Sequence, residues 1–528
     1  MKNELKRIIG IFLALLLAAS LMPAQKGFAT GESNEDGQQS SGQADLPARY
    51  DPRELGLVTP VKSQGDYGTC GTFALAAVME HNAMLRGYGE YDLSEYQLAW
   101  ALLHPLELEG DLAAGEGPEH NDTNSAWHYG VYGGILSSTL LRGYGLRTED
   151  EYPYEEMEKD LPEEAISYDG CLYPDSCYTV PATDAAAIKT LITTNGSVYL
   201  NVCARSWSDE LYGNPDTHAA YLPRFGKPYY GIDHFITVVG WDDAYSKDNF
   251  ATTPPEDGAW IIKNSWGEEV FGEDGYAYLS YCDATFNKNN CAVSVTVSPE
   301  RGYDRIYQYD GGVGLRAVKK VTDVVMGFSA AKDEVVTAVR IKPLGALESN
   351  QFYCSNWAFE ETTAVIAVYE GPFDVENPDK KEALYTQEYR ILYPDYQTVH
   401  LEQEVELTKG QEYHVRVSFK DPIYYAVDSP YQTLFYSFQN MVSAQPGETY
   451  LCTLGDGGNP KWEDPATMFG KQRPSSACLK VLVRDGEDSE AEQGQTDPGE
   501  QTDLSGFMTL IENFLKAILA ALGAMFAR

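Results

Sequence analysis

The chain has 528 residues, of which 43% are hydrophobic, enough for packed cores in about two to four domains. Its formal net charge is −40, with 79 acidic residues against 39 lysines and arginines. Because phosphate binding needs a basic face, this balance argues against nucleic acid as a partner. It suits a soluble protein that works outside a cell.

The N-terminus has the pattern of a secretory signal peptide. Lys2, Lys6 and Arg7 precede an apolar run over 8–22, and small residues follow it up to Ala29. A transmembrane anchor is the competing interpretation, but the run is short and ends in proline. We therefore expect a signal peptide over 1–29, a polar linker over 30–46, and a secreted protein, either extracellular or associated with the cell surface.

The next segment alternates between helical and strand patterns. Ordered sequence begins near residue 47, and helical spacing or composition predicts helices over 70–86, 94–103, 135–141 and 185–193. Apolar runs predict strands over 196–202, 234–241, 259–267 and 275–281. Early helices followed by later strands indicate an α+β domain over 47–300.

The remainder of the chain has a different texture. Alternating runs over 335–341, 364–369, 397–401 and 412–419, separated by turn residues, predict an all-β sandwich over 301–484. An acidic, disordered linker is expected over 485–506 and an amphipathic helix over 507–528. Because that helix carries Glu512 and Lys516, we expect peripheral membrane contact rather than a membrane span.

Nine cysteines are present, and export would allow eight of them to pair once Cys70 is set aside. Two pairs are close enough in sequence to close small loops: Cys171 with Cys177, and Cys282 with Cys291. Neither pair has the CxxC spacing of a metal site, and no histidine pair accompanies them. We expect no metal and no cofactor.

A glycine-punctuated loop leads into Cys70, which opens an alanine-rich helix. A thiol in the first turn of a helix faces unpaired backbone N–H groups, which favours the thiolate. Gln64 lies across a turn, where its amide can reach back towards the sulfur. These residues predict a nucleophile and a donor for the oxyanion of acyl transfer.

A cysteine nucleophile needs a base, and the chain has eight histidines. His234 begins an apolar strand and fits best, with His218 in a polar loop as the second candidate. His81 is excluded, because about 1.5 Å of rise per residue puts it about 16 Å along the helix from Cys70. Asn264 is a polar residue in an apolar strand and is the candidate that orients the base; stabilising a turn is its alternative role.

These residues together resemble the papain family of cysteine peptidases. The resemblance covers about 47–298 and rests on three segments in order: Gln64 to Cys70, Asp233-His234, and Lys263-Asn264-Ser265-Trp266-Gly267. It implies a two-lobed peptidase domain, with a nucleophile, a base and an orienting amide at Cys70, His234 and Asn264.

The resemblance also implies roles for the neighbouring residues. Gln64 would complete the oxyanion hole, and Trp266 would shield the bond between His234 and Asn264. Asp233 would tune the ion pair formed by the Cys70 thiolate and the His234 imidazolium. The pair Gly133-Gly134 resembles the glycines that line the substrate cleft of the family. Against the papain-type cysteine signature, Tyr67, Thr69 and Gly71 stand where a cysteine, a small residue and an aromatic are usual.

Residues 301–483 resemble the lectin-like β-sandwich that follows such peptidase domains in some bacterial secreted proteins. That resemblance implies carbohydrate as a possible partner of the β-domain, and a purely structural domain is nearly as well supported.

The leading hypothesis is a secreted cysteine endopeptidase that acts on protein or peptide substrates. A non-catalytic adhesive or glycan-binding protein on a peptidase scaffold is the alternative, motivated by Gly71 and the large β-domain. A Cys/His cell-wall amidase is a third interpretation, disfavoured by the Asn-Ser-Trp-Gly context.

Overall fold

The computed structural model describes residues 46–103, 118–120, 133–157, 161–225, 231–311, 315–350, 353–429, 438–440, 442, 444–455, 457–468 and 475–486. The chain divides into two compact units, Met1–Gly486 and Glu487–Arg528. The predicted signal peptide, most of both linkers and the C-terminal amphipathic helix lie outside the described residues. None of the described helices is long and apolar enough to cross a membrane.

The helix α2 (Cys70–Leu85) lies at the centre of the first domain. Alanine is its most frequent residue, and alanine loses little entropy on becoming helical. Fourteen consecutive residues, Cys70 to Ala83, are buried, since elements pack around the whole helix. Its neighbours are the helices α3 (Glu95–Leu103) and α5 (Gly133–Leu140) and the strands β7 (His234–Asp242) and β10 (Cys291–Ser298).

A nine-stranded, mostly antiparallel sheet completes this domain. Its strand order is β3-β10-β4-β7-β8-β9-β6-β5, and β1 pairs with β7. The bounds are β1 Arg49–Tyr50, β3 Tyr173–Pro181, β4 Val198–Val202, β5 Gly213–Asn214, β6 Ala219–Ala220, β8 Ala259–Lys263 and β9 Tyr276–Ser280. The helix α6 (Ala185–Asn195) packs on β7 and β10. Five 3₁₀ turns connect these elements: Pro52–Leu55, Tyr154–Glu156, Glu163–Ala165, Ala204–Ser208 and Lys247–Asn249.

In the described part of the second domain, every element is a strand apart from the one-turn helix α7 (Pro465–Met468). One sheet has the order β11-β25-β13-β19 (Arg305–Tyr307, Leu479–Asp485, Glu334–Ile341, Gln397–Leu407). The other has the order β18-β17-β20-β12-β22-β23 (Tyr385–Ile391, Thr362–Glu370, Glu412–Asp428, Leu315–Ser329, Thr449–Leu454, Pro460–Glu463). The short strands β14 (Pro343–Leu344) and β24 (Ser476–Ala477) pair with β20.

Valines, isoleucines and aromatic residues from both sheets of this domain share one hydrophobic core, as expected of a β-sandwich. Two further pairs of strands are β15 with β16 (Ala346–Asn350, Tyr353–Trp357) and β2 with β21 (Pro118–His120, Phe438–Asn440). The α+β domain followed by an all-β domain confirms the predicted fold class.

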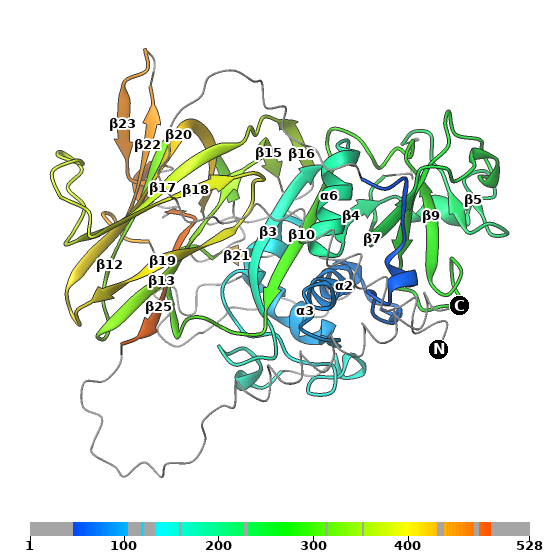
Figure 1. Ribbon diagram of the computed structural model, residues 1–528, viewed down its shortest axis with the longest axis horizontal. Coiled ribbons are helices and arrows are strands. Elements are labelled where there is room, and N and C mark those ends of the chain that lie inside the picture. The colour runs from blue at the N-terminus through cyan, green and yellow to red at the C-terminus, as the bar shows by residue number, and fades with distance from the viewer. Residues whose placement is uncertain are drawn as a thin grey trace, which may run out of the picture. The chain divides into compact units, whose positions relative to one another are not determined.

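The two domains also share a second core. Around α2, α3 and α5 it gathers buried residues of the first domain, and it includes Ile306, Leu344, Tyr396, Cys478 and Leu482 from the second. Backbone bonds cross the boundary as well, from Cys177 N to Tyr396 O at 2.7 Å and from Thr179 N to Pro394 O at 3.0 Å. The β-domain is therefore part of the packing of the helical lobe (Figure 1).

The expected small disulfide loops are wrong. Cys171, Cys177 and Cys282 are free thiols, so neither small loop is closed. Cys177 lies within β3, and an extended strand rises about 3.3 Å per residue, which separates residues 171 and 177 far beyond the Cα distance of about 6 Å that a disulfide requires. The thiol of Cys282 points to Glu256 Oε1 at 3.8 Å.

Candidate active site

Cys70 is the first residue of α2, and its side chain is 8% exposed. The loop before it turns at Gly65, whose φ of 58° is the left-handed conformation that glycine adopts without strain. The backbone N–H of Phe235, at the start of β7, donates to Cys70 Sγ at 3.4 Å. The fold therefore brings the sulfur to the residue next to His234.

The expectation of a stable thiolate is not met by the resting site. Burial raises the pKa of the Cys70 thiol to about 11, although hydrogen bonds from the backbone N–H groups of Phe235 and Gly71 lower it in part. The loss of hydration in the interior thus outweighs the helix terminus.

His234 and Asn264 form the second contact of the site. His234 Nε2 lies 2.9 Å from Asn264 Oδ1, which also accepts a hydrogen bond from Ser265 N at 2.8 Å. An amide oxygen only accepts, so Nε2 is the protonated ring nitrogen and Nδ1 is left for proton exchange. Burial lowers the pKa of His234 to about 4, with the bond to Asn264 opposing this shift. The imidazole is thus held neutral at rest.

A group of aromatic rings covers this pair. The ring of Trp266 lies 4.7 Å from that of His234, tilted by 33°. Trp207 meets the His234 ring edge-on at 6.1 Å, lies 5.7 Å from Trp266, and stacks on Phe271 at 4.9 Å. Trp207 was not singled out from the sequence; its position in a short turn after a buried strand is the only signal that it carries.

Gln64 is fixed by two side-chain hydrogen bonds. Its Nε2 donates to Tyr67 O at 2.7 Å, and its Oε1 accepts from Ser265 Oγ at 2.8 Å. One N–H of the amide remains for another acceptor, since the group carries two. Tyr154 supports this loop by donating from its hydroxyl to Gln64 O at 3.0 Å.

Asp233 is held by the turn over Ala204–Ser208. Its Oδ1 accepts from Ala204 N at 2.8 Å, and its Oδ2 pairs with Arg205 Nε at 3.2 Å. Burial raises the pKa of this carboxyl group, and the bond from Ala204 opposes the rise. The carboxylate therefore anchors the turn that carries Trp207.

One cleft of about 890 Å³ brings most of these residues together. Its lining includes Gln64, Cys70, Asp233, His234 and Trp266. His218, the second candidate base, is not among the lining residues; it lies before β6 with φ of 52°. Gly133 and Gly134 form the first turn of α5, and their contact with substrate stays a prediction.

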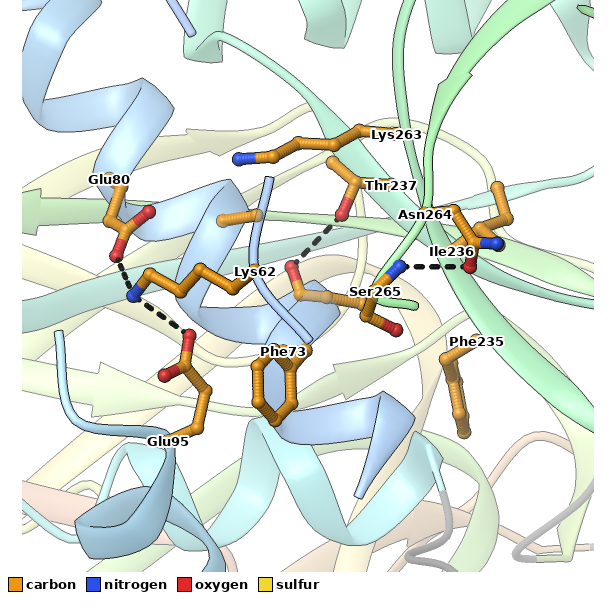
Figure 2. Close-up of a pocket in the computed structure, with 12 residues that line it drawn as sticks. Lys62, Phe73, Glu80, Glu95, Phe235, Ile236, Thr237, Lys263, Asn264 and Ser265 are labelled. Atoms are coloured by element: carbon orange, nitrogen blue, oxygen red, sulfur yellow. Dashed lines mark hydrogen bonds and ion pairs between the residues drawn. The ribbon is translucent and has the colours of Figure 1, made fainter. Parts of the chain in front are cut away.

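A cluster of buried charges lines a second pocket, to which Phe235 and Asn264 also contribute (Figure 2). Lys62 Nζ lies 2.9 Å from both Glu80 Oε1 and Glu95 Oε1. Glu80 Oε2 accepts from Thr59 Oγ1 at 2.6 Å, and Lys263 Nζ donates to that same hydroxyl at 2.9 Å. The sequence analysis did not identify this cluster, because its members are far apart in the chain.

The pKa values of the two lysines in this cluster depend on how close the opposite charges lie. Burial opposes the charge of Lys62, but the carboxylates of Glu95 and Glu80 raise its pKa above the usual range. Lys263 has a weaker compensation, and burial lowers its pKa to about 8. Burial also raises the pKa of Glu95. Because Lys263 directly precedes Asn264, this cluster anchors the strand end that carries the amide bound to His234.

Leu136 of α5 occupies the space beside Gly71, in the first turn of α2. A Cβ at Gly71 would lie 3.2 Å from Leu136 Cδ1 and 3.5 Å from Phe235 Cδ2. The absence of an aromatic residue at position 71 therefore leaves no gap, since an aliphatic side chain from another helix fills it. No group of three or more histidine, cysteine or acidic residues suited to a metal occurs in the described part of the chain.

Comparison with known proteins agrees with this geometry. Residues 46–299 match the family described as papain family cysteine protease, and residues 306–482 match the lectin-like domain. Cysteine proteinase 1 of Dictyostelium discoideum is 28% identical over 261 residues, which are 48% of this chain and 65% of that protein. Procathepsin L of Rattus norvegicus is 27% identical over 259 residues, with the same two coverages. The chain spans 65% and 52% of the length of the first two curated relatives.

Solved structures share both domains. The clostridial cysteine protease Cwp84 after propeptide cleavage aligns with a TM-score of 0.64 and 22% identity, over 83% of this chain and 99% of that one. A second structure, of the cysteine protease and lectin-like domains of Cwp84 from Clostridium difficile, gives the same TM-score and identity over 84% of this chain and 90% of that one. At this identity the likeness shows the shared fold. The family matches therefore show a papain-family cysteine protease domain over 46–299 followed by a lectin-like domain over 306–482, and the solved structures share this two-domain fold.

Proposed function

We propose that this protein is a secreted cysteine endopeptidase in which Cys70 is the nucleophile, His234 the base and Asn264 the orienting residue. The observation that carries the proposal is the pair of contacts at the start of β7. Phe235 N reaches Cys70 Sγ at 3.4 Å, while the adjacent His234 is bound to Asn264 at 2.9 Å, and the thiol and the imidazole line the same cleft.

The resting pair is neutral, and the reaction begins with a proton transfer. Burial disfavours either charge alone, but passing a proton from Cys70 Sγ to His234 Nδ1 creates both charges together, and they stabilise each other at short range. The thiolate then forms a C–S bond with the scissile carbonyl carbon. The oxyanion accepts hydrogen bonds from Gln64 Nε2 and from Cys70 N.

The second half of the cycle returns the proton. His234 protonates the leaving amine as the C–N bond breaks, and an acyl thioester remains on Cys70. Water then attacks this thioester with His234 as the base, which releases the carboxylic acid and restores the thiol. Trp266 and Trp207 keep solvent from the bond that orients the imidazole.

The triad is tested by paired substitutions in the full chain. Cys70→Ala should abolish the cleavage of casein, whereas Cys452→Ala, at a buried thiol of the β-domain, should not. His234→Ala should abolish it and His218→Ala should leave it close to wild type. Cleavage by pure Cys70→Ala protein, or loss of activity only in His218→Ala, would contradict the assignment.

The wider setting of the enzyme is part of the proposal. Cwp84 is described as a surface layer associated protein, which supports an extracellular or cell-surface location here. Carbohydrate remains a proposed ligand of the lectin-like domain, and peripheral membrane contact a proposed role of 507–528. Partition of the full chain and of residues 1–506 with anionic liposomes tests the second point, and equal partition would refute it.

The alternative, a non-catalytic adhesive protein, is less well supported. It was motivated by Gly71, but Leu136 fills the adjoining space and the three catalytic side chains are all present. Labelling with an epoxide inhibitor directed at peptidase thiols separates the two proposals: modification of Cys70 supports the enzyme, and an intact Cys70 supports the scaffold.

A further inference from the structure

The C-terminal end of α5 is completed by the second half of the chain. The last carbonyl groups of a helix have no partner within it. Here each of the three carbonyls after α5 accepts a hydrogen bond from a buried side chain beyond residue 300: Arg340 Nη1 to Leu141 O at 2.9 Å, Gln308 Nε2 to Arg142 O at 3.0 Å, and Tyr303 Oη to Gly143 O at 2.8 Å.

Two of the residues at this end carry positive charge. Arg340 and Lys342 are 1% and 2% exposed, and they lie where the helix dipole is negative. Lys342 Nζ donates to Ser138 Oγ, within α5, at 2.7 Å and pairs with Asp395 at 3.1 Å. Arg340 has a second backbone acceptor in Pro174 O at 3.0 Å. Charge and hydrogen bonding therefore fix α5 to the β-domain.

Shape complementarity adds to this attachment. Gly143 has φ of 105°, and a Cβ there would lie 2.2 Å from Ile306 Cδ1. The side chain of Ile306 thus fits against bare backbone just after α5. Any other residue at position 143 would be strained at this φ, and its Cβ would displace the end of the Ile306 side chain.

The opposite face of α5 contacts the nucleophile's helix. Leu136 packs against Gly71 and lies beside Phe235, whose N–H donates to the sulfur of Cys70. A continuous set of contacts therefore runs from Arg340 through α5 and Leu136 to the first turn of α2. Each link is buried, so a displacement of α5 cannot be absorbed by solvent.

We propose that the lectin-like domain positions the catalytic nucleophile, with Arg340 as the positioning residue and Leu136 as the contact that transmits its effect. The β-domain is then a working part of the peptidase site in addition to any ligand that it binds. The kinetic part of this inference rests on the proposed peptidase function, whereas the reactivity of the Cys70 thiol can be measured without it.

The test compares two arginine-to-lysine substitutions in the full chain. Arg340→Lys keeps the charge but cannot serve Leu141 O, Pro174 O and Thr398 Oγ1 together. Arg416→Lys is the matched control: Arg416 pairs with Asp323 and Asp379 in the β-domain, away from α5. The readouts are the rate of Cys70 alkylation by iodoacetamide, followed by mass spectrometry of its peptide, kcat and KM on a peptide substrate, and Tm.

The inference expects Arg340→Lys to lower both the alkylation rate and kcat by about threefold or more, with KM within about twofold. Arg416→Lys should leave both rates unchanged even where it lowers Tm. The double variant Arg340→Lys with Leu136→Ala should lose no more than the larger single effect, because the two residues act in one series.

Three results would overturn the inference: wild-type alkylation and kcat in folded Arg340→Lys, an equal loss in Arg416→Lys, or full additivity with Leu136→Ala. If Arg340→Lys does not fold, Tyr303→Phe removes a single hydroxyl from the same interface and replaces it in each comparison. If the wild type cleaves no peptide, the proposed function fails, and the alkylation rates alone still decide the positioning role.

Discussion

The helix α2 carries two buried polar side chains, and burial affects the charge at these two places in opposite ways. Cys70, at its first residue, lies with His234 in a cleft where burial holds the thiol and the imidazole neutral. Glu80, further along the same helix, lies among Lys62 and Lys263, and the lysine next to it keeps its charge. Similar burial thus has two outcomes. Cys70 and His234 stay neutral at rest because neither has an opposite charge beside it, whereas Glu80 and Lys62 stay charged because their opposite charges are in contact; we call this charged pair the ionic anchor.

The ionic anchor should show the largest effect. Glu80→Ala leaves Lys62 with less compensation in the interior, and we expect the free energy of unfolding to fall by about 3–5 kcal/mol in denaturant titrations. Glu54→Ala removes a carboxylate that is 64% exposed and paired with Arg49, and it should cost at most about 1 kcal/mol. Equal losses would mean that the buried cluster is not a charged anchor, and the comparison would fail.

On the catalytic side, Gln64→Ala should lower kcat roughly 10²–10³-fold, because a preorganised donor to the oxyanion is lost. Gln97 offers a matched control, since it is another buried glutamine whose amide donates to Gly145 O and Ala165 O. Gln97→Ala should destabilise the fold while the remaining folded enzyme keeps its kcat. Steady-state kinetics beside thermal unfolding separate the two outcomes, and a kcat unchanged in Gln64→Ala would remove this residue from the oxyanion hole.

The neutral imidazole predicts a definite dependence of stability on pH. Because the pKa of His234 is lowered to about 4, the unfolded chain takes up a proton first as the pH falls below the usual histidine value. The contribution of neutral His234 to the free energy of unfolding is therefore complete at neutral pH. It is lost as the pH falls from about 6.5 to 4, by up to about 3 kcal/mol. His234→Gln should flatten the unfolding free energy over this range.

His400 should make stability depend on pH in the direction opposite to His234. Its hydrogen bond to Asp175 raises its pKa, so its contribution is present at low pH and is lost as the pH rises through the raised value. His400→Gln should therefore reduce stability at acidic pH and have little effect at alkaline pH. The same pH slope in both variants would show that burial and pairing do not separate these histidines.

The smallest effect is expected at the support of the oxyanion loop. Tyr154→Phe removes the hydroxyl that donates to Gln64 O, and the net loss should be about 1 kcal/mol. A decrease of less than tenfold in kcat/KM, with an unchanged KM, would match this role. A loss as large as that of Gln64→Ala would place Tyr154 in the catalytic machinery itself.

The sequence was sufficient for the elements with strong periodicity. The helix opened by Cys70 and the strand opened by His234 were predicted within a few residues, because an unbroken apolar or alanine-rich run leaves few alternatives. The strands β3 and β12 were not predicted; both contain polar residues whose partners come from distant segments. Strand pairing of this kind is decided by tertiary contacts rather than by local pattern.

The candidate site was predictable in its residues and less so in its electrostatics. Cys70 and His234 stand out because each opens an apolar segment. Asn264 stands out because it is polar in an apolar strand, and Gln64 because it lies across a turn from Cys70. The direction of the Cys70 pKa shift was wrong, since the helix terminus was visible in the sequence and the depth of burial was not. Trp207 and Lys62 were missed because their roles depend on residues far away in the chain.

The core that contains both Leu136 and Leu482 has a consequence for how the molecule is made. The helical lobe cannot finish packing until β25, near residue 480, has been synthesised and has docked beside β13. A nascent chain would thus emerge with its first domain still loosely assembled, and a partial polypeptide released early would lack a firmly held thiol. The order of synthesis therefore delays complete packing around Cys70 until the second domain has been made.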